Sequence, residues 1–247
     1  MESLGTVEKA IDVLFHLHER GVPQGVTAIG RALEMPKSST HRLLTALGRR
    51  GLVESDERGR YRPGIALMAL ALGALDSDPV VMAARPALES AVEELGETVF
   101  LVGARGRRLV VLDKAEGTGF LRASPRIGTS VPVHATAVGK LFLALAPESI
   151  PMPAGRLESF TPATPANARD LAREIERAHR RGFAENVDEW IPGLSVIAAP
   201  VVVKGRMRAA VAVAASTQRL AKLGSERVAR RAISAAEHTA ARLEGRA

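Results

Sequence analysis

The chain has 247 residues, of which 46% are hydrophobic and 25% charged, a composition typical of a globular protein with an apolar core. It holds 34 Lys and Arg against 27 Asp and Glu, and no Cys, which excludes disulfides and thiolate metal sites. No apolar run reaches the roughly 20 residues that span a bilayer, and the N-terminus does not read as a signal sequence. We therefore expect a cytoplasmic protein that is neither exported nor inserted in a membrane.

An amphipathic helix is predicted over residues 4–20, with Leu4, Val7, Ile11, Leu14 and Leu17 along one face. It would complete a three-helix core with the two helices that follow. The net charge of +7 fits a nucleic-acid partner, but residues 1–63 hold ten basic and eight acidic side chains. Most of the excess positive charge therefore lies after residue 63, and net charge alone is weak support for DNA binding by the N-terminal region.

Residues 27–53 read as two short helices across a tight turn. Thr27 is placed to cap the first helix, with Ile29, Ala32 and Leu33 on its inner face, and Pro36 interrupts the periodic pattern. The second helix carries Leu43, Leu44 and Leu47 at helical spacing. It ends at Gly51, followed by Leu52, as a left-handed cap requires. This pattern predicts a helix-turn-helix; the alternative is an ordinary helical hairpin with a solvated charged face.

The second of these helices begins with short hydroxyl and basic side chains, which suit the N-terminal turns of a DNA recognition helix. The candidate DNA contacts are Lys37, Ser38, Ser39, Thr40, His41 and Arg42. Residues 54–64 read as a β-hairpin turning at Arg58-Gly59, with Arg58, Arg60 and Arg62 available to phosphates. The sequence therefore predicts a winged helix-turn-helix over residues 1–63.

Residues 65–75, IALMALALGAL, are almost wholly apolar, so this helix must be covered on every side. We expect a linker helix over residues 64–77 that packs between subunits; the alternative is a core helix of one large domain. Residues 78–247 read as an α+β domain that begins with a helix from Asp78 to about Leu95. Strands follow at 98–115, across an Arg-Gly turn, and at 120–124, 196–203 and 208–215, with helices near 134–146, 167–182 and 222–244. One mostly antiparallel sheet of five or six strands is expected.

The stretch TAIGRALEMPKSSTHRLLTALGRRGLVE resembles the helix-turn-helix of the IclR-type bacterial transcriptional regulators. Residues 122–144 and 182–203 resemble the two signatures of that family's effector-binding domain. The resemblance covers essentially the whole chain. It implies a DNA-binding domain, a linker helix and a ligand-binding domain related to the small-molecule-sensing GAF fold. It also implies dimers, often paired into tetramers, that bind double-stranded DNA and a small molecule.

The resemblance places an effector pocket between the segment HATAVGK and the sheet. The implied pocket residues are Phe120, Ala123, Gly128, Val131, His134, Ala135, Thr136, Ala137, Val138, Asn186, Asp188, Val196, Ala212 and Ala214. Positions that are often polar or sulfur-bearing in the family are Ala123, Val196, Ala212 and Ala214 here, and Asn186 stands where Asp is found. Such a pocket offers few side-chain hydrogen bonds. We therefore expect an effector with an apolar or aromatic part, its polar end held by backbone amides near 128–131 or 135–139.

The sequence gives weaker support for a catalytic site or a metal site. His134, Asp188, Glu189 and Ser195 could be assembled into a triad, but no strained nucleophile turn surrounds Ser195, so no catalytic residue is assigned. His134 and the acidic residues of 185–189 lack a regular metal-ligand spacing, and no metal or cofactor is expected. A structural role for them is favoured. Trp190 is read either as a lid over the pocket or as a packing residue at a subunit contact.

Two functional classes follow. The favoured one is a ligand-responsive transcription factor whose paired recognition helices read a pseudo-palindromic operator. The alternative is an assembly module that uses its winged helix for protein contacts. Loss of DNA binding on replacing Arg42 would separate the two.

Overall fold

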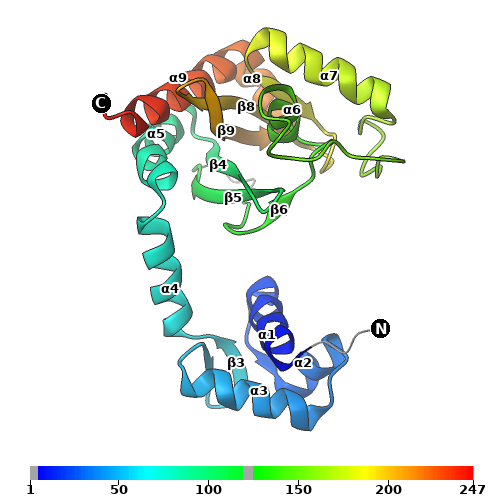
Figure 1. The fold of residues 1–247 in the computed structure, drawn as a ribbon, viewed down its shortest axis with the longest axis vertical. Helices are drawn as coiled ribbons and strands as arrows, with labels where there is room; N and C mark the ends of the chain where they lie inside the picture. Colours follow the sequence, from blue (N-terminus) through cyan, green and yellow to red (C-terminus); the bar gives the residue numbers. More distant parts are fainter. Residues whose placement is uncertain (1–4, 119–124, 247) are drawn as a thin grey trace. The chain divides into compact units, whose positions relative to one another are not determined.

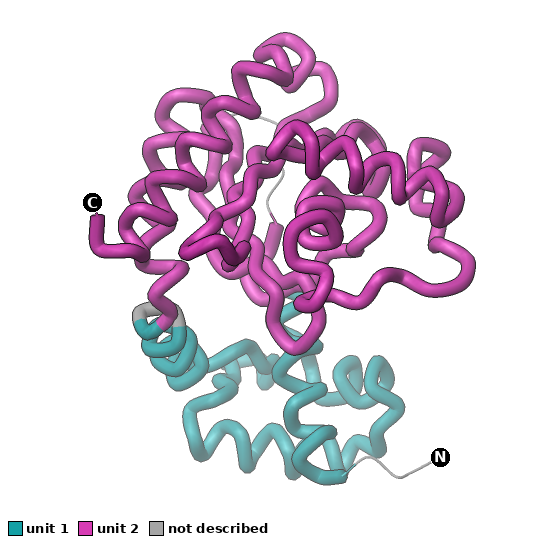
Figure 2. Tube along the Cα trace, turned by 45° about the horizontal axis from the view of Figure 1, so that its top comes forward, with its two compact units in different colours: residues 1–77 teal, residues 78–247 magenta. Residues whose placement is uncertain are grey.

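The computed structural model describes residues 5–118 and 125–246 of the chain. The chain forms two compact units, residues 1–77 and residues 78–247 (Figure 2). Each unit combines helices with its own antiparallel sheet (Figure 1). The α+β fold class predicted from the sequence is confirmed.

The first unit is a winged helix-turn-helix followed by a long helix. Its elements are α1 (Thr6–Arg20), β1 (Gln24–Gly25), α2 (Val26–Ala32), α3 (Lys37–Arg49), β2 (Val53–Ser55), β3 (Arg60–Pro63) and α4 (Ile65–Asp76). The strands pair antiparallel in the order β1-β3-β2. Leu17, Ile29 and Leu44 from the three short helices meet in its core, together with Val53 from β2. The predicted helices and wing therefore pack as one small domain.

Helix α1 buries only part of the predicted face: Leu17 is buried as predicted, whereas Val7 and Ile11 are not. Val13 and Leu17 are fully buried, whereas Val7 and Ile11 are 72% and 45% exposed. The helix is apolar over much of its circumference, so two stripes at helical spacing compete in the sequence. Contact with α3 selects the stripe that contains Val13. Leu14 is half-buried against the core, and Leu4 lies outside the described residues.

Helix α2 begins one residue before the predicted cap. Gly25 is its N-cap, so Thr27 lies exposed within the first turn and does not cap the helix. Ile29 is buried as predicted, but Ala32 is exposed, because the inward face turns toward Gly30 and Leu33 instead. The period of a seven-residue helix is too short to fix its inner face from sequence alone.

The end of α3 follows the prediction. Gly51 has φ +67° and its amide donates to the carbonyl of Gly48, while the amide of Leu52 donates to Leu47 at 3.0 Å. This is the left-handed cap that Gly permits at low cost. The hairpin that follows turns at Gly59, whose amide donates to the carbonyl of Asp56. Helix α3 and the hairpin are therefore joined by a short, well-defined connection.

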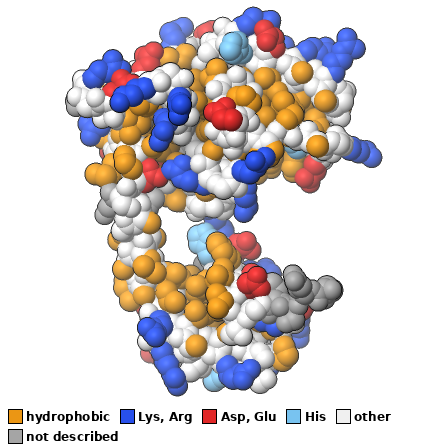
Figure 3. Space-filling view, in the orientation of Figure 1, with side chains coloured by type: hydrophobic (Ala, Val, Ile, Leu, Met, Phe, Trp, Pro, Cys, Tyr) orange, Lys and Arg blue, Asp and Glu red, His pale blue; other side chains and the backbone are white. Residues whose placement is uncertain are grey.

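Helix α4 is not covered within the first unit. Ile65, Met68, Leu70 and Leu72 are between 54% and 64% exposed. Figure 3 shows hydrophobic side chains gathered along α4 and over the adjoining part of the same unit. These exposures contradict the alternative of a buried core helix. An apolar surface of this kind marks an interaction site more often than a solvent-facing helix.

The second unit is built on an antiparallel sheet with the strand order β6-β5-β4-β9-β8-β7. In chain order its elements are α5 (Pro79–Leu95), β4 (Thr98–Arg105), β5 (Arg108–Ala115), β6 (Ser130–Val131), α6 (Ala137–Leu145), α7 (Ala168–Arg181), β7 (Ala184–Val187), β8 (Leu194–Val203), β9 (Arg206–Ser216), α8 (Thr217–Leu223) and α9 (Ser225–Leu243). The predicted β4–β5 hairpin and the two long strands β8 and β9 are confirmed. The short strands β6 and β7 and helix α8 were not predicted.

Helices cover both faces of this sheet. Helices α5 and α9 pack against one face, and α6, backed by α7, packs against the other (Figure 1). Consecutive residues of β8 are therefore buried, from Val196 to Ala199, as the apolar run predicted. Asp78 caps α5 by accepting from the amides of Val80 and Val81, and Gly96 ends the helix with φ +71°.

The strand expected at 120–124 lies outside the described residues. Among the described residues, no single helix is both long enough and apolar enough to cross a membrane. Helices α4 and α5 meet these two criteria only when they are counted together across the break between them.

Candidate functional site

Helix α3 presents the polar side chains of its first turns at the surface. Lys37, Ser38, His41 and Arg42 are exposed, and Ser39 is half-buried. Pro36 is the N-cap residue of the helix, so the chain enters α3 directly from the turn after α2. Short hydroxyl and basic groups at the start of an exposed helix suit contacts to base edges and phosphates.

Thr40 is the exception, and its prediction as a DNA contact is wrong. The side chain is fully buried, and its hydroxyl group donates to the carbonyl of Pro36 at 3.1 Å. It faces α2, where a Cβ atom at Gly30 would lie 3.0 Å from its Oγ1. Thr40 therefore joins the two helices of the motif and is not available to DNA.

The wing holds its arginines in different environments. Asp56 accepts from the backbone amides of Arg60 and Arg58, and these bonds, led by that of Arg60, hold the pKa of Asp56 below its ordinary value. The side chain of Arg60 also pairs with Asp56 at 2.8 Å, and Arg62 pairs with Glu54 at 3.3 Å. Arg58 lies exposed at the tip and makes no ion pair with the described residues.

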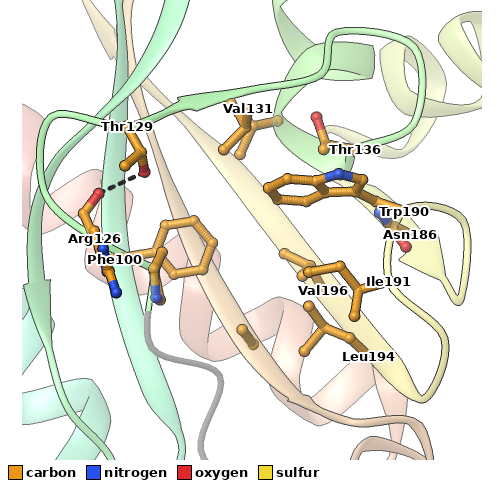
Figure 4. A pocket seen from close by; sticks show the side chains of 13 residues that line it. Phe100, Arg126, Thr129, Val131, Thr136, Asn186, Trp190, Ile191, Leu194 and Val196 are labelled. Carbon is orange, nitrogen blue, oxygen red and sulfur yellow. Dashed lines mark hydrogen bonds between the residues drawn. The ribbon is translucent and has the colours of Figure 1, made fainter. Parts of the chain in front are cut away.

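The second unit contains a pocket of about 260 Å³ between the sheet, the start of α6 and the β7–β8 loop (Figure 4). Its walls are mainly apolar. Of the residues implied by the family resemblance, those that line it are Val131, Thr136, Val138, Asn186, Val196 and Ala214. The pocket therefore lies where the resemblance placed it, between the segment HATAVGK and the sheet.

Several residues that line the pocket were not assigned to it from the sequence: Phe100, Pro125, Arg126, Thr129, Trp190, Ile191 and Leu194. Phe100 belongs to β4, whose residues are buried in succession, so alternation gives no sign of which face it occupies. Trp190 did carry a signal, as the single Trp of the chain beside Pro192 and Gly193. The structure puts Trp190 in the pocket wall.

Other residues implied by the resemblance do not line the pocket. His134 is turned away: its Nε2 lies 2.7 Å from the carbonyl oxygen of Glu158, and its ring stacks on Phe160. The carboxylate of Asp188 accepts from the amide of Gly193 and the hydroxyl of Thr217.

The remaining residues that the resemblance assigned to the pocket have structural roles or lie outside the described residues. Ala135, Ala137 and Ala212 are completely buried, and the amide of Gly128 donates to the carbonyl of Val111. Two backbone segments, 128–131 and 135–139, were expected to bind the polar end of the effector. In the first of them, the Gly128 amide is already hydrogen-bonded to β5. Phe120 and Ala123 lie outside the described residues.

The neutral polar side chains of the pocket mostly bond to the protein itself. Asn186 donates to the carbonyl of Ala135 at 2.5 Å, and its Oδ1 accepts from the amide of Glu189. Thr136 is the N-cap of α6; its hydroxyl donates to the carbonyl of Pro132 and accepts from the amide of Gly139. These bonds shape the pocket and leave few groups for a ligand.

A buried ion pair lies behind the pocket wall. Lys140 is fully buried, and its Nζ lies 2.6 Å from Oε1 of Glu189, 2.9 Å from the carbonyl oxygen of Glu185 and 3.3 Å from Oε2 of Glu174. Burial raises the pKa of Glu189 above its ordinary value, and the Lys140 ammonium group opposes that rise. The Glu189 Oε2 atom is buried without a hydrogen-bond partner among the described residues. Glu189 directly precedes Trp190 in the chain.

Ser195, considered for a triad, bonds to the hydroxyl of Thr217 at 3.0 Å, whereas His134 bonds to Glu158. The serine and the histidine therefore have separate structural partners. The described residues contain no group of three or more His, Asp or Glu placed to hold a metal ion.

Both units match known protein families. Residues 6–57 match the IclR helix-turn-helix domain, and residues 72–241 match the C-terminal domain of the bacterial transcriptional regulator IclR. The HTH-type transcriptional regulator XynR of Escherichia coli is 30% identical over 205 residues, 81% of either chain.

Solved structures give the same fold. The IclR of Thermotoga maritima superimposes with a TM-score of 0.81 at 26% identity, covering 96% of this chain and 98% of that one. An IclR homologue of Microbacterium hydrocarbonoxydans, complexed with 4-hydroxybenzoate, has a TM-score of 0.81 at 22% identity, covering 98% and 100%. Helix-turn-helix and effector domain both match, so the chain belongs to the IclR family of bacterial transcriptional regulators, which are not enzymes.

Proposed function

We propose that the protein binds a pseudo-palindromic operator as a dimer or tetramer in the cytoplasm, and that a small organic effector in the pocket changes its affinity for that DNA. The apolar pocket of the second unit carries this proposal. A ligand that prefers one arrangement of the subunits shifts the population toward it.

The DNA-reading residues are assigned by exposure. Ser39, His41 and Arg42 contact base edges from α3, while Lys37 and Ser38, at the first turn, contact phosphates. Arg58 is the wing residue best placed for phosphate, because it is exposed and makes no ion pair with the described residues. Arg60 and Arg62 would exchange Asp56 and Glu54 for phosphate on binding.

The effector is proposed to be a small molecule with an aromatic or apolar body and an anionic end. The pocket walls supply Phe100, Val196 and Leu194, so affinity comes mainly from apolar burial. Thr136 and Val138 bring the first turn of α6 to the pocket, where amides at a helix N-terminus favour an anion. The Microbacterium homologue with 4-hydroxybenzoate is a precedent for this class of ligand in the same fold.

Pairing of two chains is proposed to cover α1 and α4. A groove of about 740 Å³ runs between these helices and β3, and Phe15 and Met68 line it while being 62% and 59% exposed. Val7 and Ile11 extend the same apolar surface along α1. A second copy offers an identical surface by two-fold symmetry, and the pairing would also hold two recognition helices in fixed relation.

The experiment is a titration of labelled operator DNA, with and without an aromatic acid, using the wild type and Ala214→Leu. Ala214 lines the pocket, so the larger side chain fills part of it. Wild-type affinity for DNA should change with the acid, and the variant should bind DNA but respond less. Ala166→Leu, in an exposed loop, is the control. An unchanged response in Ala214→Leu would exclude this pocket as the effector site.

A further inference from the structure

Trp190 is the single Trp of the chain, and it forms one wall of the effector pocket. Its ring stands across the pocket from Phe100, and the edge that carries the indole nitrogen is the one nearest Thr136 in the view (Figure 4). Among the described residues, no acceptor binds that nitrogen, and it is not one of their buried unpartnered atoms, so its N–H is open to water. The wall thus combines an aromatic face with an unused N–H donor.

The other neutral polar groups of the pocket are already occupied. The hydroxyl of Thr129 donates to the carbonyl of Arg126 at 2.6 Å, and that of Thr136 donates to Pro132 at 2.6 Å. Asn186 uses both ends of its amide within the protein. A ligand that fills the pocket removes water from the indole N–H. An apolar ligand would leave that donor unsatisfied, whereas an oxygen acceptor would restore its hydrogen bond.

The backbone on the N-terminal side of Trp190 is held at several points. The hydroxyl of Thr161 donates to the carbonyl of Asp188, and that of Thr164 donates to the carbonyl of Glu189, both at 2.6 Å. The Glu189 side chain is held by Lys140 at 2.6 Å from inside the domain. The residue that follows these anchors is Trp190, so its starting point is fixed before a ligand arrives.

We infer that Trp190 determines which effector the pocket accepts: a flat ring bearing an oxygen acceptor, bound by the indole face and N–H. The buried Lys140–Glu189 pair is the positioning element that holds this wall in place. The inference rests on the proposed function, since it assumes that this pocket is the effector site. It adds a requirement that apolar burial alone does not make, namely an acceptor on a planar ligand.

The ligand class is tested on the full chain with benzoate, 4-hydroxybenzoate and cyclohexanecarboxylate as probes. The two benzoates should quench or shift the Trp190 emission and bind more tightly than the non-planar acid by calorimetry. Trp190→Phe keeps a ring but removes the N–H, and should weaken benzoate binding roughly five- to tenfold. Equal affinity for planar and non-planar acids, no binding of either benzoate, or undiminished binding by Trp190→Phe would overturn the inference.

The positioning role is tested by removing the ion pair. Lys140→Met leaves the buried Glu189 carboxylate unpaired and is expected to destabilise the fold, so the double variant Lys140→Met/Glu189→Met is the informative one. Glu174, which also contacts Lys140, keeps its ion pair with Arg177 at 3.1 Å in this variant. The double variant should fold, but its Trp190 emission anisotropy and benzoate affinity should fall severalfold. The control replaces the Arg85–Asp113 pair, in which Asp113 is buried and Arg85 exposed on the α5 side of the sheet, by Met in the same way. Unchanged anisotropy and affinity in a folded Lys140/Glu189 double variant would contradict the positioning role.

Binding of operator DNA without any probe separates this inference from the proposed function. Wild type that binds the operator but neither benzoate would overturn the ligand class and leave the regulator intact. Wild type that binds a benzoate in the predicted manner but recovers no DNA would support the role of Trp190 and contradict the proposed function.

Discussion

Gly30 in α2 packs directly against the buried hydroxyl group of Thr40 in α3. A Cβ atom at residue 30 would lie 3.0 Å from Thr40 Oγ1 and 2.9 Å from the carbonyl oxygen of Met35. The second neighbour is backbone and cannot swing aside. The close approach of the two helices, and with it the orientation of α3, therefore depends on the absence of a side chain at this position.

Gly30→Ala is expected to destabilise the first unit by about 1–3 kcal/mol, because an inserted methyl group forces the turn apart. Urea unfolding measures the change. Gly48→Ala is the matched control, since a Cβ there meets only atoms at 3.8 Å or beyond. In the interior of α3 it should be neutral or stabilising by up to about 1 kcal/mol. Equal stabilities for both variants would refute the tight packing of the motif.

The salt dependence of operator binding distinguishes phosphate contacts from base contacts. Lys37→Ala and Arg58→Ala should each lower the slope of log affinity against log salt by about 0.9. Arg42→Ala should cost about 1–3 kcal/mol and relax sequence preference, as loss of a base contact does.

Lys222→Ala is the control for these variants, because Lys222 is exposed on α8 in the other unit. It should leave affinity and slope unchanged. Loss of affinity in the control equal to that in Arg58→Ala would mean that general charge, and not the wing, governs the interaction.

The apolar surface of α4 gives a test of assembly. Leu72 is 54% exposed, and Leu72→Asp places a charge that would be buried when two chains pair. We expect the dimer to weaken by at least tenfold in sedimentation equilibrium, together with loss of operator binding. Met152→Asp changes an equally exposed side chain, at 56%, in a loop of the other unit and should have no effect. An unaltered mass for Leu72→Asp would remove α4 from the interface.

Asp113 gives the chain a defined dependence of stability on pH. Its side chain is 1% exposed, and burial raises the pKa above its ordinary value of about 3.9, although the Lys114 amide and Arg85 oppose this. A raised folded pKa means that stability is lost as pH climbs from about 3.9 through the folded value.

Asp113→Asn cannot ionise but keeps an oxygen that accepts from Arg85 and Lys114. The unfolding free energy of the variant minus that of the wild type should therefore rise with pH across this window and then level off. Urea unfolding at a series of pH values checks it. A difference that falls as pH rises would show that pairing with Arg85 outweighs burial.

The sequence predicted where helices and turns begin and end better than it predicted which face of a helix is buried. The cap at Gly51, the hairpin at Gly59 and the N-cap at Asp78 follow from local backbone chemistry, which a few neighbouring residues determine. The inner face of α1 was predicted only in part: Leu17 is buried as predicted, but Val13 replaces Val7, because contact with α3 decides between two apolar stripes.

The family resemblance predicted part of the pocket lining, but it did not predict residues that reach the site through long-range contacts. Thr136, Val138, Val196 and Ala214 line the pocket as the family resemblance implied. Phe100 joins them only through the pairing of β4 with β9, a contact between residues more than a hundred positions apart. Thr40 fits a recognition helix by residue type, and its burial depends on the close approach of Gly30, which no local pattern reveals.

The most direct test of the account is recovery of genomic DNA fragments bound by the purified full chain, at moderate salt that suppresses non-specific binding. It should be done with and without 4-hydroxybenzoate. We predict enrichment of a pseudo-palindromic site, with a yield that changes when the acid is present and that is lost in Arg42→Ala. Absence of any enriched sequence under both conditions would contradict the account that this winged helix reads DNA under control of the pocket.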